Sequence, residues 1–578
     1  MNIVHKILMA SAFAFIAMGL SAQNIDPTVV VSRDYEGKLM EVHKPKLEMA
    51  VPDSVLRFDL DFDYSVSDSP YKGSYDFTPY VLEMRPSPVA RDAGSLYVNA
   101  GAGYQLHPEL DVVWSPLNKN NSFRMNVFAR HRSYYGRYWD VEPSASDKGL
   151  VFDRASDGAS RLGLDMLNRA GVDGRFDWKK GTLRFDAGYY GLLQQDKSQA
   201  AISRSFNAVD ASMSVASKDS RDASFGYMVA VDYRYGNDAL SGLDRTSLRE
   251  NLMGLDASLL VPLKKVNRVR VDVEYDMAGY DGCFDAFASV MSAAPRYVRL
   301  GKIWDLDLGV KLAKVLRDKN MADMYQNRIQ AIYPDVKVGF KAVPSIYLYT
   351  AVTGGSQLET YSSLLASDRR INAFYADVCP ALLDVTDQSV RAELGIEGSI
   401  TTHFSYAVRG GYSRYANAPL AAAYLKDDVY CPGIAYSPYS KVFASVECGL
   451  DTERIDFDAS AGYSYFMTDG EIGAFLPSAV MADASLKYNW RKRIYAGVSC
   501  EAATAREGYV RELSSDEISY VKASIPGYVD LGVNIEYVLN HKLSFWAKGW
   551  NLLGMTVQRS LFYAEKGPGF TLGVCFNM

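Results

Sequence analysis

Segments in which apolar and polar residues strictly alternate recur along most of this chain, and they constrain its fold more than any other feature. In residues 529–537 every odd position is apolar and every even position is polar or glycine. Successive side chains of a β-strand point to opposite faces of a sheet. Such a segment therefore predicts a strand with one apolar face and one wet face.

The same alternation occurs in residues 123–127, 183–188, 269–275, 304–311 and 455–463. The polar faces carry charges of both signs, as the wall of a wet lumen would. Closing such strands into a barrel pairs every backbone group without water, which lipid requires. We predict an all-β fold, a transmembrane antiparallel β-barrel of about 22 strands, or an even number from roughly 16 to 22. A soluble array of β-sandwiches or a propeller is the alternative.

The connections between these segments alternate in length. Short polar turns are expected at 178–181, 451–454, 490–493 and 539–542, and longer loops near 135–159, 357–388, 415–438, 467–478, 505–521 and 552–566. Short periplasmic turns and long extracellular loops are typical of such barrels. The last segment alternates from Phe570 to Phe576, and its near-terminal aromatic residue resembles the signal that barrel-assembly machinery recognises.

The N-terminal part has a different pattern. Lys6 precedes an apolar run and Ala22 offers a small residue for cleavage, so residues 1–22 are predicted to be a signal peptide. Residues 23–94 are rich in proline and are expected to form a periplasmic extension, while residues 95–578 form the barrel. The extension has three possible places: the periplasm, the lumen, or a partner bound by strand addition.

Composition narrows the possible functions. The 40 tyrosines fit aromatic girdles at two membrane interfaces. The net charge of −6 and the absence of a basic stripe give no support to nucleic-acid binding. The six cysteines lack metal-ligand spacing, and we expect mostly free thiols with at most one loop pair, such as Cys379 with Cys431.

No motif of a known enzyme class is present. There is no GxSxG, Walker A or HExxH pattern. His131 lies near the top of an expected strand, but no Ser or Asp can be assigned beside it from the sequence, so it is interpreted as an ordinary interfacial histidine. Asp59, Asp61 and Asp63 are interpreted as a solvated strand face rather than a calcium site. We therefore expect no enzyme, no cofactor and no metal.

The polar faces supply the best candidates for function. These side chains are expected to face the lumen, where their charges would select solutes or pair across neighbouring strands and stiffen the wall. They are Arg124, Arg184, Asp186, Arg270, Asp272, Glu274, Asp305, Asp307, Asp456, Asp458, Asp530 and Glu536.

Three short motifs carry a family resemblance. They are Trp550-Asn551-Leu552-Leu553-Gly554, Gly567-Pro568-Gly569-Phe570, and Tyr333-Pro334-Asp335-Val336 with Thr353-Gly354-Gly355. On the first two motifs the chain resembles the barrel domain of TonB-dependent receptors of the Bacteroidota type, over roughly residues 95–578, and the third motif is similar to segments of plug-deficient relatives. Such receptors carry a plug domain of well over a hundred residues, and residues 23–94 show no pattern of one. The resemblance thus implies the barrel and leaves energised import in doubt.

Two functions remain open. The first is a barrel that transports or binds solutes through a polar lumen. The alternative is a structural or assembly component that docks lipoproteins or other envelope proteins. In both cases the expected location is the outer membrane. The expected partners are outer-membrane lipids and lipopolysaccharide, barrel-assembly machinery during biogenesis, and lipoproteins or periplasmic proteins, with no nucleic acid.

Overall fold

The structure is a computed structural model. It describes residues 95–116, 122–195, 203–218, 225–241, 247–264, 266–283, 285–318, 331–343, 345–371, 383–401, 403–426, 429–468, 473–513 and 518–578. The predicted signal peptide, the extension at 23–94 and Cys379 lie outside these residues. Among the described residues, no helix is long and apolar enough to cross a membrane.

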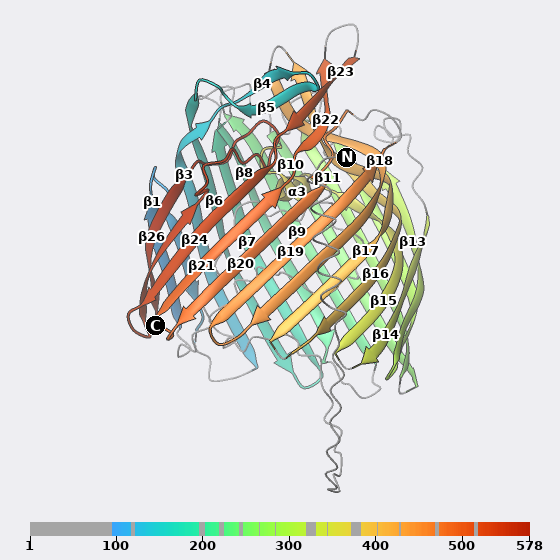
Figure 1. The fold of residues 1–578 in the computed structure, drawn as a ribbon. Helices are drawn as coiled ribbons and strands as arrows, with labels where there is room; N and C mark the ends of the chain where they lie inside the picture. Colours follow the sequence, from blue (N-terminus) through green and yellow to red (C-terminus); the bar gives the residue numbers. More distant parts are fainter. Residues whose placement is uncertain are drawn as a thin grey trace, which may run out of the picture. The chain divides into compact units, whose positions relative to one another are not determined.

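Twenty-two strands form the wall of a closed barrel (Figure 1). They are β1 (Leu96–Gly103), β2 (Glu109–Trp114), β3 (Phe123–Trp139), β6 (Ser160–Trp178), β7 (Gly181–Gln195), β8 (Ser203–Ser217), β9 (Gly226–Ser241), β10 (Ser247–Lys264), β11 (Asn267–Gly282), β12 (Ala286–Leu300), β13 (Trp304–Arg317), β14 (Ile332–Val343), β15 (Ile346–Glu359), β16 (Asp384–Ser399), β17 (Phe404–Lys426), β18 (Val429–Asp451), β19 (Ile455–Met467), β20 (Val480–Trp490), β21 (Ile494–Ala503), β24 (Tyr528–Val538), β25 (Leu543–Trp550) and β26 (Gly569–Asn577).

The first and last strands close the wall. β1 and β26 pair antiparallel from Tyr97 with Asn577 to Gly103 with Thr571. Each remaining wall strand also pairs antiparallel with its neighbours, β3 with β6 and β21 with β24 included. The predicted antiparallel barrel of about 22 strands is therefore confirmed.

The apolar face of the wall points outward. In β26, Phe570, Leu572, Val574 and Phe576 are exposed, whereas Thr571 is buried on the opposite face. The strand β24 alternates in the same way. A closed barrel with an apolar outer face satisfies its backbone internally and presents hydrocarbon to lipid. The chain is thus a β-barrel protein of the outer membrane.

Four further strands lie outside the wall. β4 (Val141–Ser146) pairs with β5 (Gly149–Arg154), and β22 (Arg506–Leu513) pairs with β23 (Ile518–Ile525). Two parallel pairings, β17 with β22 and β5 with β23, join these hairpins to the extended top of the wall. The expectation of loops across 135–159, 415–438 and 505–521 was therefore wrong for most of the residues that the structure describes there. These residues are mostly paired strand, because backbone groups gain partners in the neighbouring hairpins.

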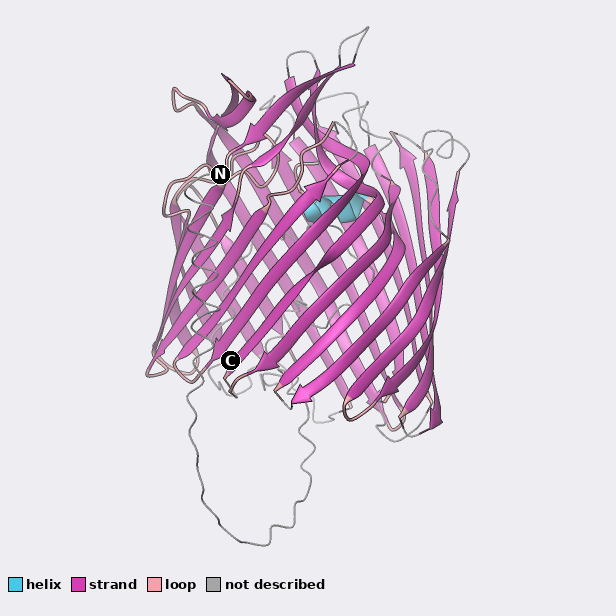
Figure 2. Cartoon of the chain, turned by 45° about the vertical axis from the view of Figure 1, so that its right-hand side comes forward, coloured by secondary structure: helices cyan, strands magenta, loops and turns pink. Residues whose placement is uncertain are grey.

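The wall is uneven in height. β17 and β18 have 23 residues each, whereas β1, β2, β25 and β26 have six to nine. Above the short strands lies the segment 551–568, called here the roof loop. The helix α3 (Tyr361–Ser367) lies inside the wall near its upper end (Figure 2). Both segments shape the lumen.

The outward face of β24 gives a test of membrane insertion. Replacing the exposed Ile535 by Arg is expected to lower the free energy of unfolding by about 1–2 kcal/mol, because the charge would enter the apolar band between its middle and the lower end of β24. Urea unfolding in lipid vesicles measures the effect, with Ile535→Ala as the control for lost side-chain volume. An Arg variant no less stable than the Ala variant would contradict a lipid-facing position.

Candidate functional site

The upper ends of β15 and β16 bend into the lumen. The register of β15 against β16 shifts between Thr353 and Gly355, and that of β16 against β17 shifts around Gln388. Such bulges re-aim a strand. Beyond them, most residues on both faces of the ribbon are buried, including Leu358 and Asp384. The inward bend carries the connecting segment 360–371, called here the strap, into the barrel.

Buried polar groups anchor the strap to the inner wall. Arg204 on β8 donates to Asp238 on β9 at 2.9 Å and to the Tyr361 hydroxyl at 2.6 Å, and that hydroxyl also bonds Asp238. Glu250 on β10 accepts from the Ser362 backbone N–H at 3.0 Å. Buried charges are tolerated only when they are paired and hydrogen-bonded. The anchor residues therefore hold α3 against β8–β10.

The roof loop begins and ends at the motif residues that carry the family resemblance. Asn551 has φ 46°, a left-handed conformation that Asn tolerates better than most residues. Its Nδ2 donates to the carbonyls of Met555 at 3.0 Å and Lys566 at 3.4 Å. Trp550 Nε1 donates to the Gly567 carbonyl at 3.0 Å. The two motifs thus form one structural unit at the foot of the loop.

The roof loop has two chemically different sides. Leu561, Phe562 and Ala564 are buried in an apolar cluster with residues of the outer hairpins, among them Phe152 on β5 and Val510 on β22. Val557, Arg559, Glu565 and Lys566 line a cavity on the other side. The loop therefore separates the packed outer hairpins from the lumen.

The strap and the roof loop touch one another. Ser560 donates to Asp368 at 2.5 Å. The Arg370 guanidinium lies 3.5 Å from Asp165 on β6, 5.7 Å from the ring centroid of Tyr138 and 5.1 Å from that of Tyr563. Cation–π and ionic contacts of a desolvated Arg are each worth about 0.5–2 kcal/mol. The strap and the roof loop are therefore in contact with each other inside the barrel, and together they are called here the inner arc.

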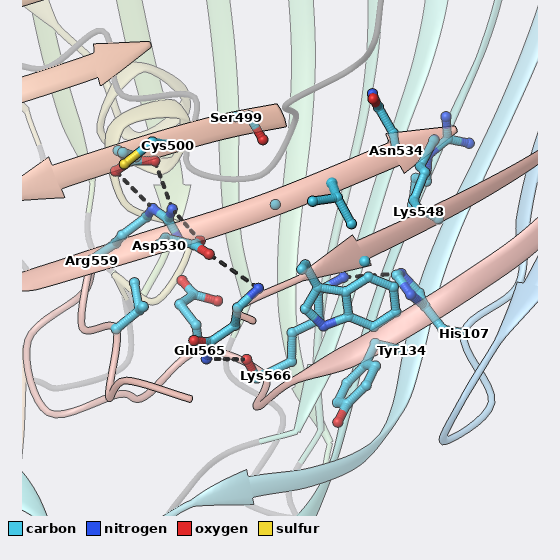
Figure 3. A pocket seen from close by; sticks show the side chains of 18 of the residues that line it. His107, Tyr134, Ser499, Cys500, Asp530, Asn534, Lys548, Arg559, Glu565 and Lys566 are labelled. Carbon is cyan, nitrogen blue, oxygen red and sulfur yellow. Dashed lines mark hydrogen bonds and ion pairs between the residues drawn. The ribbon is translucent and has the colours of Figure 1, made fainter. Parts of the chain in front are cut away.

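A cavity of about 440 Å³ lies beneath the roof loop. Its charged residues are five bases and six acids, namely Arg132, Arg369, Lys548, Arg559 and Lys566 with Glu109, Asp165, Asp483, Glu501, Asp530 and Glu565. Tyr134, Tyr138 and Trp550 add aromatic surface. Figure 3 shows Arg559 beside Asp530 at one end and Lys566 beside His107 at the other. The cavity therefore offers charges of both signs with aromatic faces.

Three carboxylates stand side by side at one end of the cavity. Asp483 on β20 is in register with Glu501 on β21, which is in register with Asp530 on β24. Like charges directly opposite each other destabilise a sheet. Arg559 compensates by bonding Glu501 at 2.7 Å and Asp530 at 3.0 Å, and Ser460 donates to Asp483 at 2.5 Å. The roof loop thus supplies the cation that this part of the wall requires.

The other end of the cavity is basic. Lys548 bonds Glu109 at 3.1 Å, and Lys566 Nζ lies 3.3 Å from His107 Nε2 and 4.1 Å from the Trp550 ring centroid. Burial lowers the pKa of Lys566 to about 8 and raises the pKa of Glu565 to about 8. Burial and the nearby Lys566 charge lower the pKa of His107 to about 3. His107 is therefore neutral at pH 7, where Lys566 is close to its titration range.

Most of the twelve residues predicted to face the lumen lie in cross-strand contacts. Arg296 on β12 bonds Asp272 and lies 3.7 Å from Asp307. Lys311 on β13 bonds Glu274 at 2.8 Å. These pairs join β11, β12 and β13 on one face of the wall. Their arrangement matches the second of the two roles that the sequence left open, in which charges pair across strands and stiffen the barrel wall.

Further pairs follow the same rule. Lys341 bonds Asp305 at 2.8 Å, and Lys487 bonds Asp456 at 3.0 Å. Asp186 accepts a hydrogen bond from Ser212 on β8. Each pair joins neighbouring strands, so a charge that faces the lumen also contributes to the wall.

The remaining candidates are more dispersed. Arg124 and Arg184 are both in register with Arg175 on β6, which places three basic residues in one row. Asp458 is in register with Ser485.

Only one of the twelve candidates reaches the cavity. Asp530 lines it, whereas Arg270 contacts Asp272 and Glu536 is buried in register with Trp546. A role of any of the twelve in solute selection stays a prediction.

The sequence did not reveal the cavity residues of the inner arc. Arg369 falls in the expected loop 357–388, and Arg559, Glu565 and Lys566 fall in or beside the expected loop 552–566. Loops were assigned to the extracellular side, and nothing in their composition marks an inward fold. The available signal was the pair of motifs at Trp550-Asn551 and Gly567-Pro568, which constrain both ends of one loop.

Several solved structures have a fold similar to that of this chain. No protein-family model and no curated protein matches the sequence. Among solved structures, the siderophore receptor PirA from Acinetobacter baumannii has 10% identity and a TM-score of 0.58 over 84% of this chain and 80% of that chain. The FrpB iron transporter from Neisseria meningitidis has 9% identity and a TM-score of 0.60, with coverages of 84% and 81%.

The copper transporter OprC has 12% identity and a TM-score of 0.57, with coverages of 84% and 80%. Identities this low show a shared barrel fold and no more. The barrel fold implied by the sequence resemblance is thereby supported. The ligands named for these proteins are not assigned to this chain.

Removing the Arg559 charge is expected to destabilise the protein. In Arg559→Gln, Glu501 and Asp530 would lie side by side without a cation, and the free energy of unfolding should fall by about 1–3 kcal/mol. The double variant Glu501→Gln/Arg559→Gln should recover part of this loss. Urea unfolding measures both, and Arg249→Gln, which breaks an exposed pair with Asp281, should cost less than about 1 kcal/mol. Equal losses in Arg559→Gln and Arg249→Gln would contradict this role of Arg559.

Lys566 is expected to react with acylating reagents at unusually low pH. The neutral amine is the reactive form, and the pKa of Lys566 is lowered to about 8. The Glu565 charge raises that pKa, so Glu565→Gln should shift the labelling midpoint of Lys566 to lower pH. Mass spectrometry of labelled peptides measures the profile, with the exposed Lys148 as a reference for reagent reactivity. An unchanged or higher midpoint in Glu565→Gln would contradict the assignment.

Proposed function

We propose that this barrel binds solutes in the cavity beneath the roof loop and passes them through its lumen. One observation carries the proposal: eleven ionisable side chains and three aromatic rings line a cavity of about 440 Å³ inside a closed membrane barrel. Charges that line a pore set the field that selects solutes. A wall that served only as a scaffold would not need the Arg369 and Lys566 side chains turned to this cavity.

The inner arc is the part of the proposal that replaces a separate plug. The strap contacts the inner face of β8 and meets the roof loop at Asp368 and Ser560. Both are continuous with the barrel strands, so they narrow the lumen permanently. We therefore infer a passive or gated route without an obligatory energy-transducing partner. The names of the structural neighbours, which are receptors and transporters, support a transport role.

We further infer how the chain is exported and what the mature protein contacts. Residues 1–22 would be removed on export, residues 23–94 would form a periplasmic extension, and barrel-assembly machinery would insert the mature chain. The apolar outer wall would contact outer-membrane lipids and lipopolysaccharide. Lipoproteins and other periplasmic proteins are candidate partners of the extension.

Planar-bilayer recording of the purified protein tests the proposal. The parent barrel is expected to conduct ions, and Arg369→Glu should shift the reversal potential toward cation selectivity because the charge of one cavity-lining residue is reversed. Arg249→Glu changes an exposed residue at the outer end of β10 by the same charge and should leave the reversal potential unchanged. A silent parent barrel that co-purifies with a lipoprotein would contradict transport and favour the assembly role.

A further inference from the structure

Three polar side chains stand together on the outer, apolar face of the barrel. His131 and Ser133 lie on β3, and Asn168 lies directly opposite His131 on β6. Figure 1 shows these two strands side by side in the wall. The side chain of His131 bonds both of the others. From the sequence no Ser was assigned to His131, although Ser133 lies two residues further on and shares its strand face. Asn168 is 37 residues away, and only the strand register brings it close.

The alternation of both strands shows that this group faces outward. On β3 the exposed residues Val127 and Tyr135 have the same parity as His131 and Ser133. On β6 the exposed Leu162 has the parity of Asn168, whereas Asp165, of the other parity, bonds Arg370 of the strap inside the barrel. Side chains two residues apart share a face of a strand. The three polar residues therefore face outward, beside the exposed Val127, Tyr135 and Leu162.

The hydrogen bonds have the connectivity of a nucleophile, a base and an orienting group. His131 Nδ1 lies 2.7 Å from Asn168 Oδ1, and His131 Nε2 lies 2.9 Å from Ser133 Oγ. Asn168 turns its amide oxygen, which only accepts hydrogen bonds, toward the ring, and the tautomer that satisfies this contact carries its proton on Nδ1. Nε2 is then the acceptor for the Ser133 hydroxyl. A serine whose proton points at a histidine held in this tautomer is the arrangement that activates serine for acyl transfer.

The group lies at the height of the membrane surface. Ser133 is ten residues above Phe123, where β3 begins. A strand tilted by about 40° rises roughly 2.5 Å per residue along the membrane normal, so Ser133 lies about 25 Å above Phe123, close to the height of the apolar band of such barrels. Tyr135 and then Arg137 follow on the same face. Lipid ester groups occupy this depth, between hydrocarbon and water.

Apolar residues flank the polar group on both sides. The exposed Leu110 on β2 is in register with His131, and Met166 on β6 is in register with Ser133. These side chains offer contact to acyl chains beside a reactive hydroxyl. The ligand that fits is a lipid whose ester bond lies at the membrane surface.

We propose that Ser133, His131 and Asn168 form a second functional site, which hydrolyses ester bonds of lipids at the outer surface of the barrel. Ser133 Oγ attacks the ester carbonyl carbon as His131 Nε2 takes the hydroxyl proton. The tetrahedral intermediate collapses, the ester C–O bond breaks, and the alcohol leaves with the proton from His131. Water then attacks the acyl-serine with His131 as base, which releases the carboxylic acid and restores Ser133. Asn168 is a positioning residue that holds the histidine tautomer.

The same outer surface supplies a matched control. Ser205 on β8 also bonds an asparagine, Asn207, whose Nδ2 donates to Ser205 Oγ at 2.9 Å. Asn207 in turn accepts from Tyr189 at 2.7 Å. This pair satisfies its polar groups without a histidine, so Ser205 has no base. A merely structural role of outward polar residues would make Ser133 and Ser205 equivalent.

The test uses the full-length protein in vesicles of phosphatidylethanolamine. A fluorophosphonate probe should label Ser133, identified by mass spectrometry, and the parent should release fatty acid from the vesicles. Ser133→Ala and His131→Gln should lose the activity at least 100-fold, and Ser205→Ala should retain it. Asn168→Ala should lower the rate about tenfold and change its pH profile, while Asn168→Asp should restore most of the rate.

Migration of the folded barrel in unheated gels checks that each variant is assembled. Three results would each overturn the proposal: a parent that releases no fatty acid above the blank, activity that persists in Ser133→Ala, or a probe that reacts equally with Ser133 and Ser205. None of these results depends on whether the lumen conducts, so the proposed transport function is tested separately.

Discussion

The whole structure depends on one requirement: every backbone N–H and C=O inside the membrane must find a partner within the protein. Pairing β1 with β26 meets it by leaving no open edge in the wall. The same requirement explains features above the membrane. Where wall strands extend beyond the lipid, as β17 and β18 do, the hairpin β22–β23 pairs with the end of β17, and the hairpin β4–β5 pairs in turn with β23. A single constraint thus accounts for the barrel and for the sheet that continues beyond it.

Closing so wide a barrel creates a second requirement, because the polar inner face must be satisfied too. Cross-strand ion pairs satisfy most of it, as Lys311 with Glu274 shows. Where like charges meet, a folded-in segment supplies the missing charge: Arg559 of the roof loop lies against Glu501 and Asp530. The inner arc is therefore part of the electrostatics of the wall. This coupling is why a cavity with charges of both signs can persist in the lumen.

The sequence predicted the elements whose signal is local. Alternation at residues 529–537 and 455–463 identified β24 and β19, and the short turns at 178–181 and 490–493 are the observed strand junctions. Features that depend on distant contacts were missed. The inward fold of the strap rests on register shifts near Gly355 and Gln388, and its anchors Arg204, Asp238 and Glu250 are over 100 residues from Tyr361. Composition carries no record of such contacts, so the cavity could not be located from the sequence.

Polar groups on the outer wall face hydrocarbon, whereas the charges on the inner wall face a wet lumen. A hydroxyl or imidazole facing hydrocarbon is costly unless it is hydrogen-bonded, so pairing alone does not show function. Tyr189 with Asn207 meets that need with two residues. His131 is different because it lies between two partners. Asn168 accepts the hydrogen bond from Nδ1, and the Ser133 hydroxyl donates to Nε2. Hydrogen bonding alone would satisfy these polar side chains without a histidine placed between an amide and a serine. Polar residues at the membrane surface occur in any interfacial girdle of a barrel. What distinguishes a catalytic site from such a girdle is the order in which the hydrogen-bond donors and acceptors follow one another.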